Sequence, residues 1–150
     1  MAQAELSRLR EAVAAVAKRL DVSESIGRLK RKLRESADAF VWSEVDLRDV
    51  RVPAEIRSVW IFVLKAQRWS EAHFHPNSIQ YMVVLEGEAF AKIGEDFSAL
   101  SGDDWTVIDA GVPHEFYPIG QEMVVMSFHT ADAEALLEVA ASDSRARRYN

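Results

Sequence analysis

Short apolar runs separated by glycine and proline fill most of the chain after residue 39, and they constrain the fold more than any other feature. The runs lie at residues 40–42, 58–64, 79–85, 89–93, 105–108, 114–118 and 123–128. Turn-forming residues such as Gly87, Gly94 and Gly102 separate them at nearly regular intervals. Several short strands with turn signals at such spacing indicate an all-β sandwich or barrel.

Residues 1–38 carry a helical pattern instead. The apolar positions of the first helix recur at steps of three and four, and they are Leu6, Leu9, Val13, Val16 and Leu20. A second helix is expected at about residues 24–37, with Ile26, Leu29 and Leu33 on one face and basic residues on the other. We expect this helical hairpin to cover the barrel or a symmetry mate. The alternative is that its basic run contacts an acidic partner or a membrane surface.

The length of 150 residues fits a single domain with a complete core. We expect an N-terminal helical extension at residues 1–38, the β-barrel at 39–130, and a C-terminal helix and tail at 131–150. The short C-terminal helix is expected because residues 133–140 return to a helical pattern, and the charged end after residue 144 is expected to fray.

Composition and charge exclude several classes of function. A net charge of −6 and a pI near 5.2 argue against nucleic-acid binding, which depends on Lys and Arg that neutralise phosphates. The absence of cysteine excludes disulfides, thiolate ligands and cysteine nucleophiles, and it is compatible with a reducing compartment. The first ten residues are charged throughout, unlike a signal peptide, and no run of about 18 apolar residues could cross a membrane. We therefore expect a cytoplasmic protein with neither nucleic acid nor membrane as a partner.

Histidines at particular spacings are the candidates for chemistry. His73 and His75 are two residues apart, so in an extended strand they share a face and both rings can approach one point. Gln80 begins the next apolar run and can return to the same point from a neighbouring strand, and His114 would be the fourth member. Imidazole suits zinc, iron, nickel and copper, so these residues predict a metal site with an open position for a ligand.

The same residues resemble the two motifs of the cupin superfamily. The spacing of His-x-His, four residues, Gln80, six residues and Gly87 resembles the first motif, and residues 102–114 resemble the second. Together the motifs cover about residues 56–129, as in a single-domain cupin with a conserved barrel. The resemblance implies a jelly-roll barrel (a double-stranded β-helix) with one divalent transition metal ion held by the three histidines and Gln80.

This chain departs from the cupin pattern at four positions. Gln80 stands where glutamate is usual, while Gln67, Asp109 and Pro118 replace the usual glycine, proline and asparagine in turns. Three neutral imidazoles and a neutral amide would leave a divalent ion with a site charge of about +2, which favours an anionic ligand such as a carboxylate, enolate or catecholate. Iron, manganese, nickel, zinc and copper all accept this donor set. Gln80 is either a ligand, a hydrogen-bond partner of a metal-bound water, or simply a polar cavity residue.

Period-two alternation identifies further pocket residues. If Gln80 faces the cavity, Met82 and Val84 face it too, and Phe116 shares the face of His114. His129 ends the run 123–128, where a polar residue is normal, and a place in the pocket is its alternative role.

The other face of the run 79–85 is apolar as well, which a strand wetted on one side would not show. It must therefore be covered by the N-terminal helices or by a second subunit. We expect a homodimer, since most soluble oligomers are symmetric dimers.

Two functions of different classes follow from these residues. The first is a metal-dependent enzyme, similar to a cupin dioxygenase, isomerase or lyase, that acts on a small anionic substrate. The second is a small-ligand sensor or binding protein that uses the same pocket without turnover. No residue near the motifs is an evident general base for such an enzyme. A third hypothesis is a metal-free barrel with a vestigial site.

Overall fold

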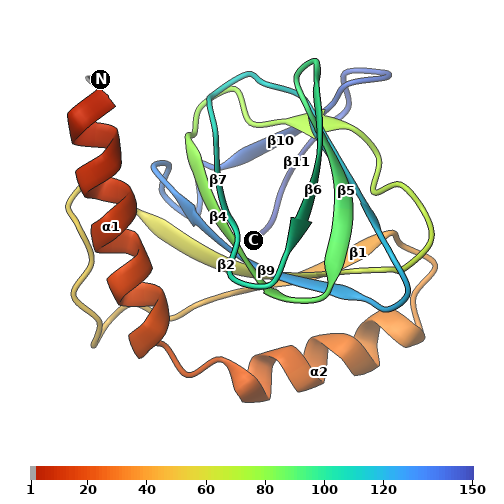
Figure 1. Cartoon of the computed structure of the whole chain (residues 1–150), viewed down its shortest axis with the longest axis horizontal. Helices are drawn as coiled ribbons and strands as arrows, with labels where there is room; N and C mark the ends of the chain where they lie inside the picture. Colours follow the sequence, from red (N-terminus) through yellow and green to blue (C-terminus); the bar gives the residue numbers. More distant parts are fainter. Residues whose placement is uncertain (1–2) are drawn as a thin grey trace.

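The computed structural model describes residues 3–150, with side chains from residue 8 onward, as two helices and two antiparallel sheets (Figure 1). The helices are α1 (Gln3–Arg19) and α2 (Ser23–Arg34). The strands are β1 (Phe40–Glu44), β2 (Ser58–Leu64), β3 (His73–Phe74), β4 (Gln80–Glu86), β5 (Glu88–Ile93), β6 (Asp96–Ser101), β7 (Trp105–Ile108), β8 (His114–Pro118), β9 (Met123–His129), β10 (Leu137–Ala140) and β11 (Ala146–Arg148).

The two sheets combine strands that are distant in sequence. The five-stranded sheet has the order β1-β2-β9-β4-β7, and the six-stranded sheet has the order β11-β10-β3-β8-β5-β6. The predicted mostly-β architecture is confirmed, and a strand occupies each predicted apolar run. The sequence predicted an extended strand carrying His73, and β3 confirms it. Strand β6 was not predicted, because its sequence, DFSALS, is exposed along most of its length.

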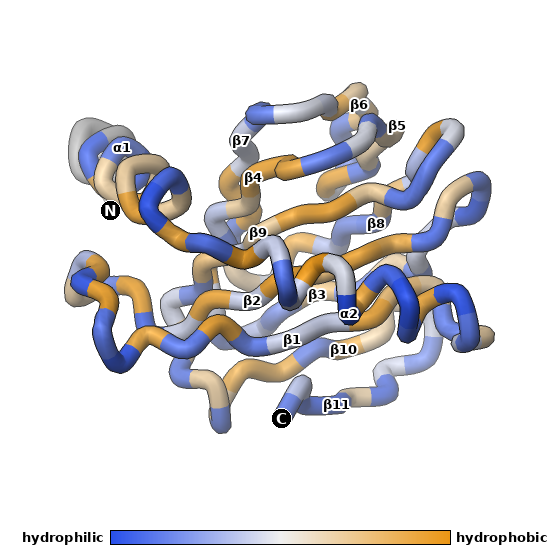
Figure 2. Tube along the Cα trace, turned by 90° about the horizontal axis from the view of Figure 1, so that it is seen from below, coloured by the Kyte–Doolittle hydropathy of each residue, from blue (hydrophilic) through white to orange (hydrophobic). Residues whose placement is uncertain are grey.

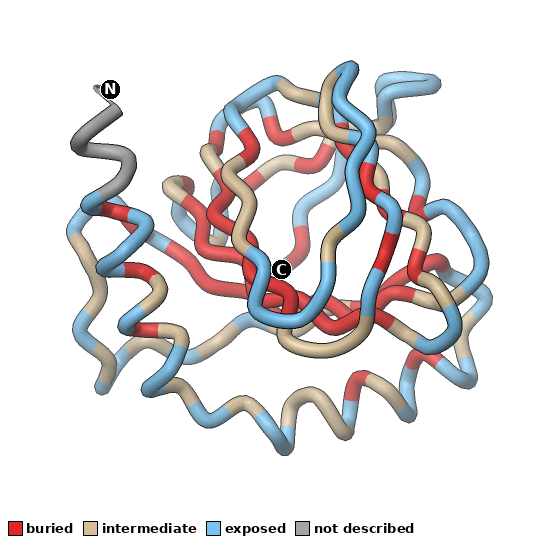
Figure 3. The backbone as a smooth tube through the Cα atoms, in the orientation of Figure 1, coloured by how far each residue is buried: buried red, intermediate tan, exposed pale blue. Residues whose placement is uncertain are grey.

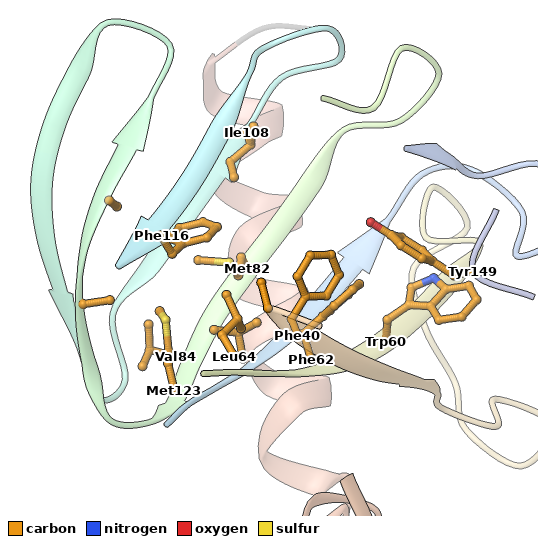
Figure 4. Packing of buried hydrophobic residues seen from close by; sticks show 14 of the residues in the cluster. Phe40, Trp60, Phe62, Leu64, Met82, Val84, Ile108, Phe116, Met123 and Tyr149 are labelled. Atoms are coloured by element: carbon orange, nitrogen blue, oxygen red, sulfur yellow. The ribbon is translucent and has the colours of Figure 1, made fainter. Parts of the chain in front are cut away.

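The five-stranded sheet is apolar on both faces. Its inward side chains, including Phe40, Met82 and Val84, pack with Phe116 from the opposite sheet and with Tyr149 (Figure 4). The outward residues pack beneath the helices, and Figure 2 shows β2 and β9 as largely hydrophobic. Period two therefore sets the two faces of β4 as predicted.

Helices α1 and α2 supply the cover that the outer face requires (Figure 3). Val13, Val16, Leu29 and Leu33 are buried against this face. Leu6, the first residue of the predicted stripe, lies outside the described side chains. The apolar outer face therefore no longer argues for a second subunit, and the homodimer stays a prediction.

The predicted C-terminal helix is wrong, because residues 137–140 and 146–148 form strands β10 and β11. Strand β10 pairs with β3 and so covers an edge of that short strand, which a helix could not do. Helix propensity is a weak local preference that such tertiary pairing overrides. The end of the chain is not frayed either, since Tyr149 is buried in the inner cluster. Among residues 3–150, no helix has both the length and the apolar character that a membrane span needs.

Candidate metal centre

Three histidines of the six-stranded sheet converge inside the molecule. His73 in β3 and His114 in β8 are direct cross-strand partners, and His75 follows β3 on the same face as His73. Each ring contributes one nitrogen to a group in which all such atoms lie within 4.8 Å of one another. Nitrogens bound to one ion at about 2.0–2.1 Å lie at most about 4.2 Å apart, so any pair near the upper limit of this group would close further around a bound ion.

Main-chain carbonyl oxygens lie beside the Nδ1 atoms of all three rings. The Nδ1 atoms of His75, His114 and His73 lie 2.8, 3.0 and 3.3 Å from the carbonyl oxygens of Leu137, Val112 and Glu71. A carbonyl oxygen only accepts, so each Nδ1 carries the proton and each Nε2 keeps its lone pair. The Nε2 of His114 is buried without a hydrogen-bond partner, as expected of a nitrogen prepared for a metal.

Burial keeps these histidines uncharged. Desolvation and the neighbouring His75 lower the pKa of His73 to about 3. Burial also lowers the pKa values of His75 and His114, against the opposing effects of their hydrogen bonds to the Leu137 and Val112 carbonyls and, less strongly, of the Glu138 carboxylate. Only the neutral form of imidazole binds a metal, so protons compete weakly for the site near pH 7.

The opposite wall of the cavity presents an amide. Gln80 begins β4, and its Nε2 donates a hydrogen bond of 2.9 Å to Ser127 Oγ in β9. This leaves Gln80 Oε1 buried without a partner in the cavity that the three histidines line. Ser127 was missed, although period two from Val125 on the run 123–128 places it on the same face.

The other predicted pocket residues differ in whether they line the cavity. Met82 and Phe116 line the cavity, whereas Val84 lies in the inner cluster outside the cavity wall. His129 is fully buried at the end of β9, with its ring centre 4.9 Å from that of His75. Its Nδ1 lies 2.8 Å from Ser78 Oγ, and its Nε2 has no partner. Burial lowers the pKa of His129 well below its usual value, so this ring is neutral as well.

An aromatic side chain from the C-terminus completes the pocket. Tyr149 lines the cavity, and its ring centre lies 5.2 Å from that of Phe62 and 6.1 Å from that of His75. Figure 4 shows the Tyr149 ring beside Trp60. The indole Nε1 of Trp42 donates a hydrogen bond of 2.8 Å to the main-chain carbonyl oxygen of Tyr149. The sequence offered little sign of this role beyond an aromatic residue within a charged tail. The cavity volume is about 30 Å³, far below the roughly 300–1,000 Å³ that is usual for ligand pockets, so it has room for an ion and only a few further atoms.

The residues present fit a divalent transition metal. Three neutral imidazoles present convergent nitrogens, and an unpaired amide oxygen shares their cavity. Imidazole nitrogens suit iron, nickel, zinc and copper, and the amide oxygen is a donor that manganese also accepts.

Comparison with known proteins agrees with this architecture. The Cupin domain family matches residues 60–130. Hazelnut (Corylus avellana) vicilin is similar in structure, with a TM-score of 0.58 and 15% identity over 70% of this chain and 33% of its own. Oxalate decarboxylase from Lactobacillus farciminis has a TM-score of 0.57 and 17% identity over 71% of this chain and 32% of its own. The DMSP lyase DddQ from Ruegeria pomeroyi DSS-3 has a TM-score of 0.57 and 19% identity over 71% of this chain and 54% of its own.

These neighbours share the fold, but the matched part spans only about a third of vicilin and of the decarboxylase and about half of the lyase. No curated protein matches the sequence.

Proposed function

Because this chain belongs to the cupins through the domain at residues 60–130, we propose that it is a metal-dependent enzyme acting on a small anionic organic substrate. The observation that carries the proposal is the convergence of three neutral imidazoles whose Nδ1 atoms face main-chain carbonyls. A bound transition metal would supply Lewis-acid or redox chemistry at this point. His73, His75 and His114 would hold it, and Gln80 Oε1 is a further candidate ligand.

The charge of the pocket favours an anion. The described residues that line the cavity include no aspartate or glutamate, so the charge of a divalent ion would not be balanced by its immediate surroundings. In a cavity of low dielectric, such a charge attracts a carboxylate more strongly than it does in water. Oxalate oxidase, another structural neighbour at 16% identity and a TM-score of 0.52, has been crystallised with glycolate, a small carboxylate.

The apolar lining limits the size of the substrate and orients it. Phe40, Phe62, Leu64, Met82 and Phe116 surround the histidines and leave little room beyond a few heavy atoms around the metal. Hydroxyl groups of Ser70 and Ser127 are among the few polar atoms that could bind a second polar end of the ligand. The reaction class would be dioxygenase-like, isomerase-like or lyase-like. A cytoplasmic location and a homodimer remain predictions from the sequence.

Metal content and turnover together test this proposal. Protein purified without an affinity tag should contain about one transition metal ion per chain by elemental analysis. Metal-loaded protein should then convert a member of a panel of small carboxylates, such as oxalate or glycolate, in aerobic buffer followed by NMR and oxygen uptake. His114→Ala is the control, because it should lose both metal and turnover.

Two other outcomes would contradict the enzyme. Stabilisation by a ligand without product, which reaches about 2.7 kcal/mol at a hundredfold excess over Kd, would indicate the sensor or binding function instead. Failure to bind any divalent metal would indicate a vestigial site.

A further inference from the structure

A carboxylate lies buried directly behind the histidine cluster. Glu138 in β10 is among the buried charged residues, and its side chain is only 8% exposed. Its Oε1 accepts a hydrogen bond of 2.6 Å from the Tyr149 hydroxyl, and its Oε2 accepts one of 2.5 Å from Arg147 Nε. A charged group is costly to bury unless it is paired, and the Arg147 guanidinium and the Tyr149 hydroxyl supply that pairing here.

The same carboxylate faces a candidate metal ligand. Oε1 of Glu138 lies 3.6 Å from Nδ1 of His73, the nitrogen that points away from the metal position. This distance is too long for a hydrogen bond, and the Glu71 carbonyl oxygen is nearer at 3.3 Å. His73 therefore has the weakest carbonyl contact of the three rings, and it is the ring with a carboxylate beside it.

Strand pairing determines this arrangement. Ala140 of β10 pairs with His73 of β3, and Glu138 pairs with Arg147 of β11. The Arg147 guanidinium lies over the rings of Phe40 and Trp42, with centroid distances of 5.2 and 5.0 Å. All of the tail residues involved lie outside the region 60–130 that matches the family.

We propose that Glu138 is a positioning residue of the metal centre, whose buried carboxylate, held by Tyr149 and Arg147, orients His73 and strengthens it as a ligand. The inference rests on the proposed metal site. A metal draws electron density from the imidazole and makes its Nδ1–H a stronger donor, so the attraction between that proton and Glu138 increases on binding. Carboxylates that accept a hydrogen bond from the second nitrogen of a ligating histidine raise its basicity and fix its orientation, and shortening of the 3.6 Å separation on metal binding would bring Glu138 into that contact. Glu138 thus places a carboxylate one layer behind the ligands, where it is paired with Arg147 and leaves the cavity lining itself without an acidic residue.

The rival explanation is a structural clamp, in which Glu138 and Arg147 only fasten the tail. The two explanations predict different directions for the change in metal affinity when each partner is replaced. A clamp loses tail packing when either partner is removed, so any effect on metal binding has the same direction for both variants. A positioning carboxylate gives opposite effects, because Glu138→Gln removes the charge that favours the cation whereas Arg147→Gln removes a charge that opposes it.

Titration of the apoprotein with Co²⁺, followed by its visible absorption, separates the two explanations. We expect Glu138→Gln to raise the Kd for Co²⁺ by about 10- to 100-fold. Arg147→Gln should lower the Kd by roughly three- to tenfold. Glu134→Gln is the matched control, since it removes an exposed carboxylate from the same segment and should leave the Kd unchanged. Thermal unfolding of each apoprotein reports separately on packing.

Each outcome decides the question. An unchanged Kd in folded Glu138→Gln overturns the inference, and so does weaker binding in both Glu138→Gln and Arg147→Gln. If Glu138→Gln does not fold, Arg147→Gln decides alone, with tighter binding in support and unchanged or weaker binding against. If wild-type protein binds no Co²⁺, the proposed function fails as well, whereas tight wild-type binding with no effect of Glu138→Gln defeats only this inference.

Discussion

The two walls of the pocket hold their polar groups in different ways. On the six-stranded sheet, the Nδ1 atoms of His73, His75 and His114 face main-chain carbonyls. On the five-stranded sheet, Gln80 lines the cavity and donates to the Ser127 hydroxyl, while His129, buried just outside the cavity lining, contacts the Ser78 hydroxyl. A carbonyl can only accept, so the first wall has fixed proton positions, whereas a hydroxyl can donate or accept and leaves the second wall adjustable.

The Ser78 hydroxyl illustrates the difference. It lies 2.8 Å from His129 Nδ1 and 3.3 Å from the carbonyl oxygen of Ile79, and it accepts a hydrogen bond from the backbone of Ala131. If the hydroxyl donates to the carbonyl, Nδ1 of His129 carries the proton. If it donates to His129 instead, the proton is on Nε2. The histidine wall is therefore suited to hold an ion, and the opposite wall is suited to adapt to whatever binds beside it.

The largest expected effect comes from removing one ring of the histidine wall. His114→Ala should weaken Co²⁺ binding by more than about 100-fold, since 10–100-fold is usual for partners that only support a ligand. His129→Gln, on the other wall, is the matched control and should change the Kd by less than about tenfold. Calorimetric titration of the two variants measures both values. Equal losses would show that His129 belongs to the ligand set and that the two walls are not distinct.

Acid should destabilise the metal-free protein. The pKa of His73 falls from 6.5 to about 3 on burial, so the unfolded state binds more protons between these values and stability decreases as pH falls. From pH 7 to pH 5, His73 alone should remove about 2 kcal/mol from the free energy of unfolding, at about 1.4 kcal/mol per pH unit below 6.5. Urea unfolding with a chelator measures this change. His73→Phe should reduce the slope, and a flat profile for the wild type would mean that the rings are not held neutral.

The histidine wall could be predicted further from the sequence than its surroundings. The spacing of His73 and His75, together with the later His114, is a local pattern that strand geometry converts into a shared face. Ser127 was equally accessible through period two. The role of Glu138 could not be predicted from the sequence, because it depends on the pairing of β10 with β3, which lies about 65 residues earlier in the chain.

The tail shows why local pattern fails there. Residues 133–140 have a helical composition, yet strand β10 forms because it covers the edge of β3 and brings Glu138 inward. Tyr149 is buried only because Trp42, Trp60 and Phe62, from strands early in the chain, form a site for its ring. Contacts between residues so far apart in the chain leave no periodic pattern in the sequence.

The smallest effect, and the sharpest test of the adjustable wall, comes from Gln80→Glu. The new carboxylate would face the metal across the cavity, so we expect Co²⁺ to bind about tenfold more tightly, equivalent to about 1.4 kcal/mol. Oxalate should bind the Co²⁺-loaded variant more weakly, because the site loses about one positive charge. Ser127→Ala is the matched control, since it removes the hydrogen bond to the Gln80 amide, costs about 1 kcal/mol of stability, and adds no charge. If Gln80→Glu changes neither affinity, the amide oxygen does not face the ion, and the histidine wall alone would define the centre.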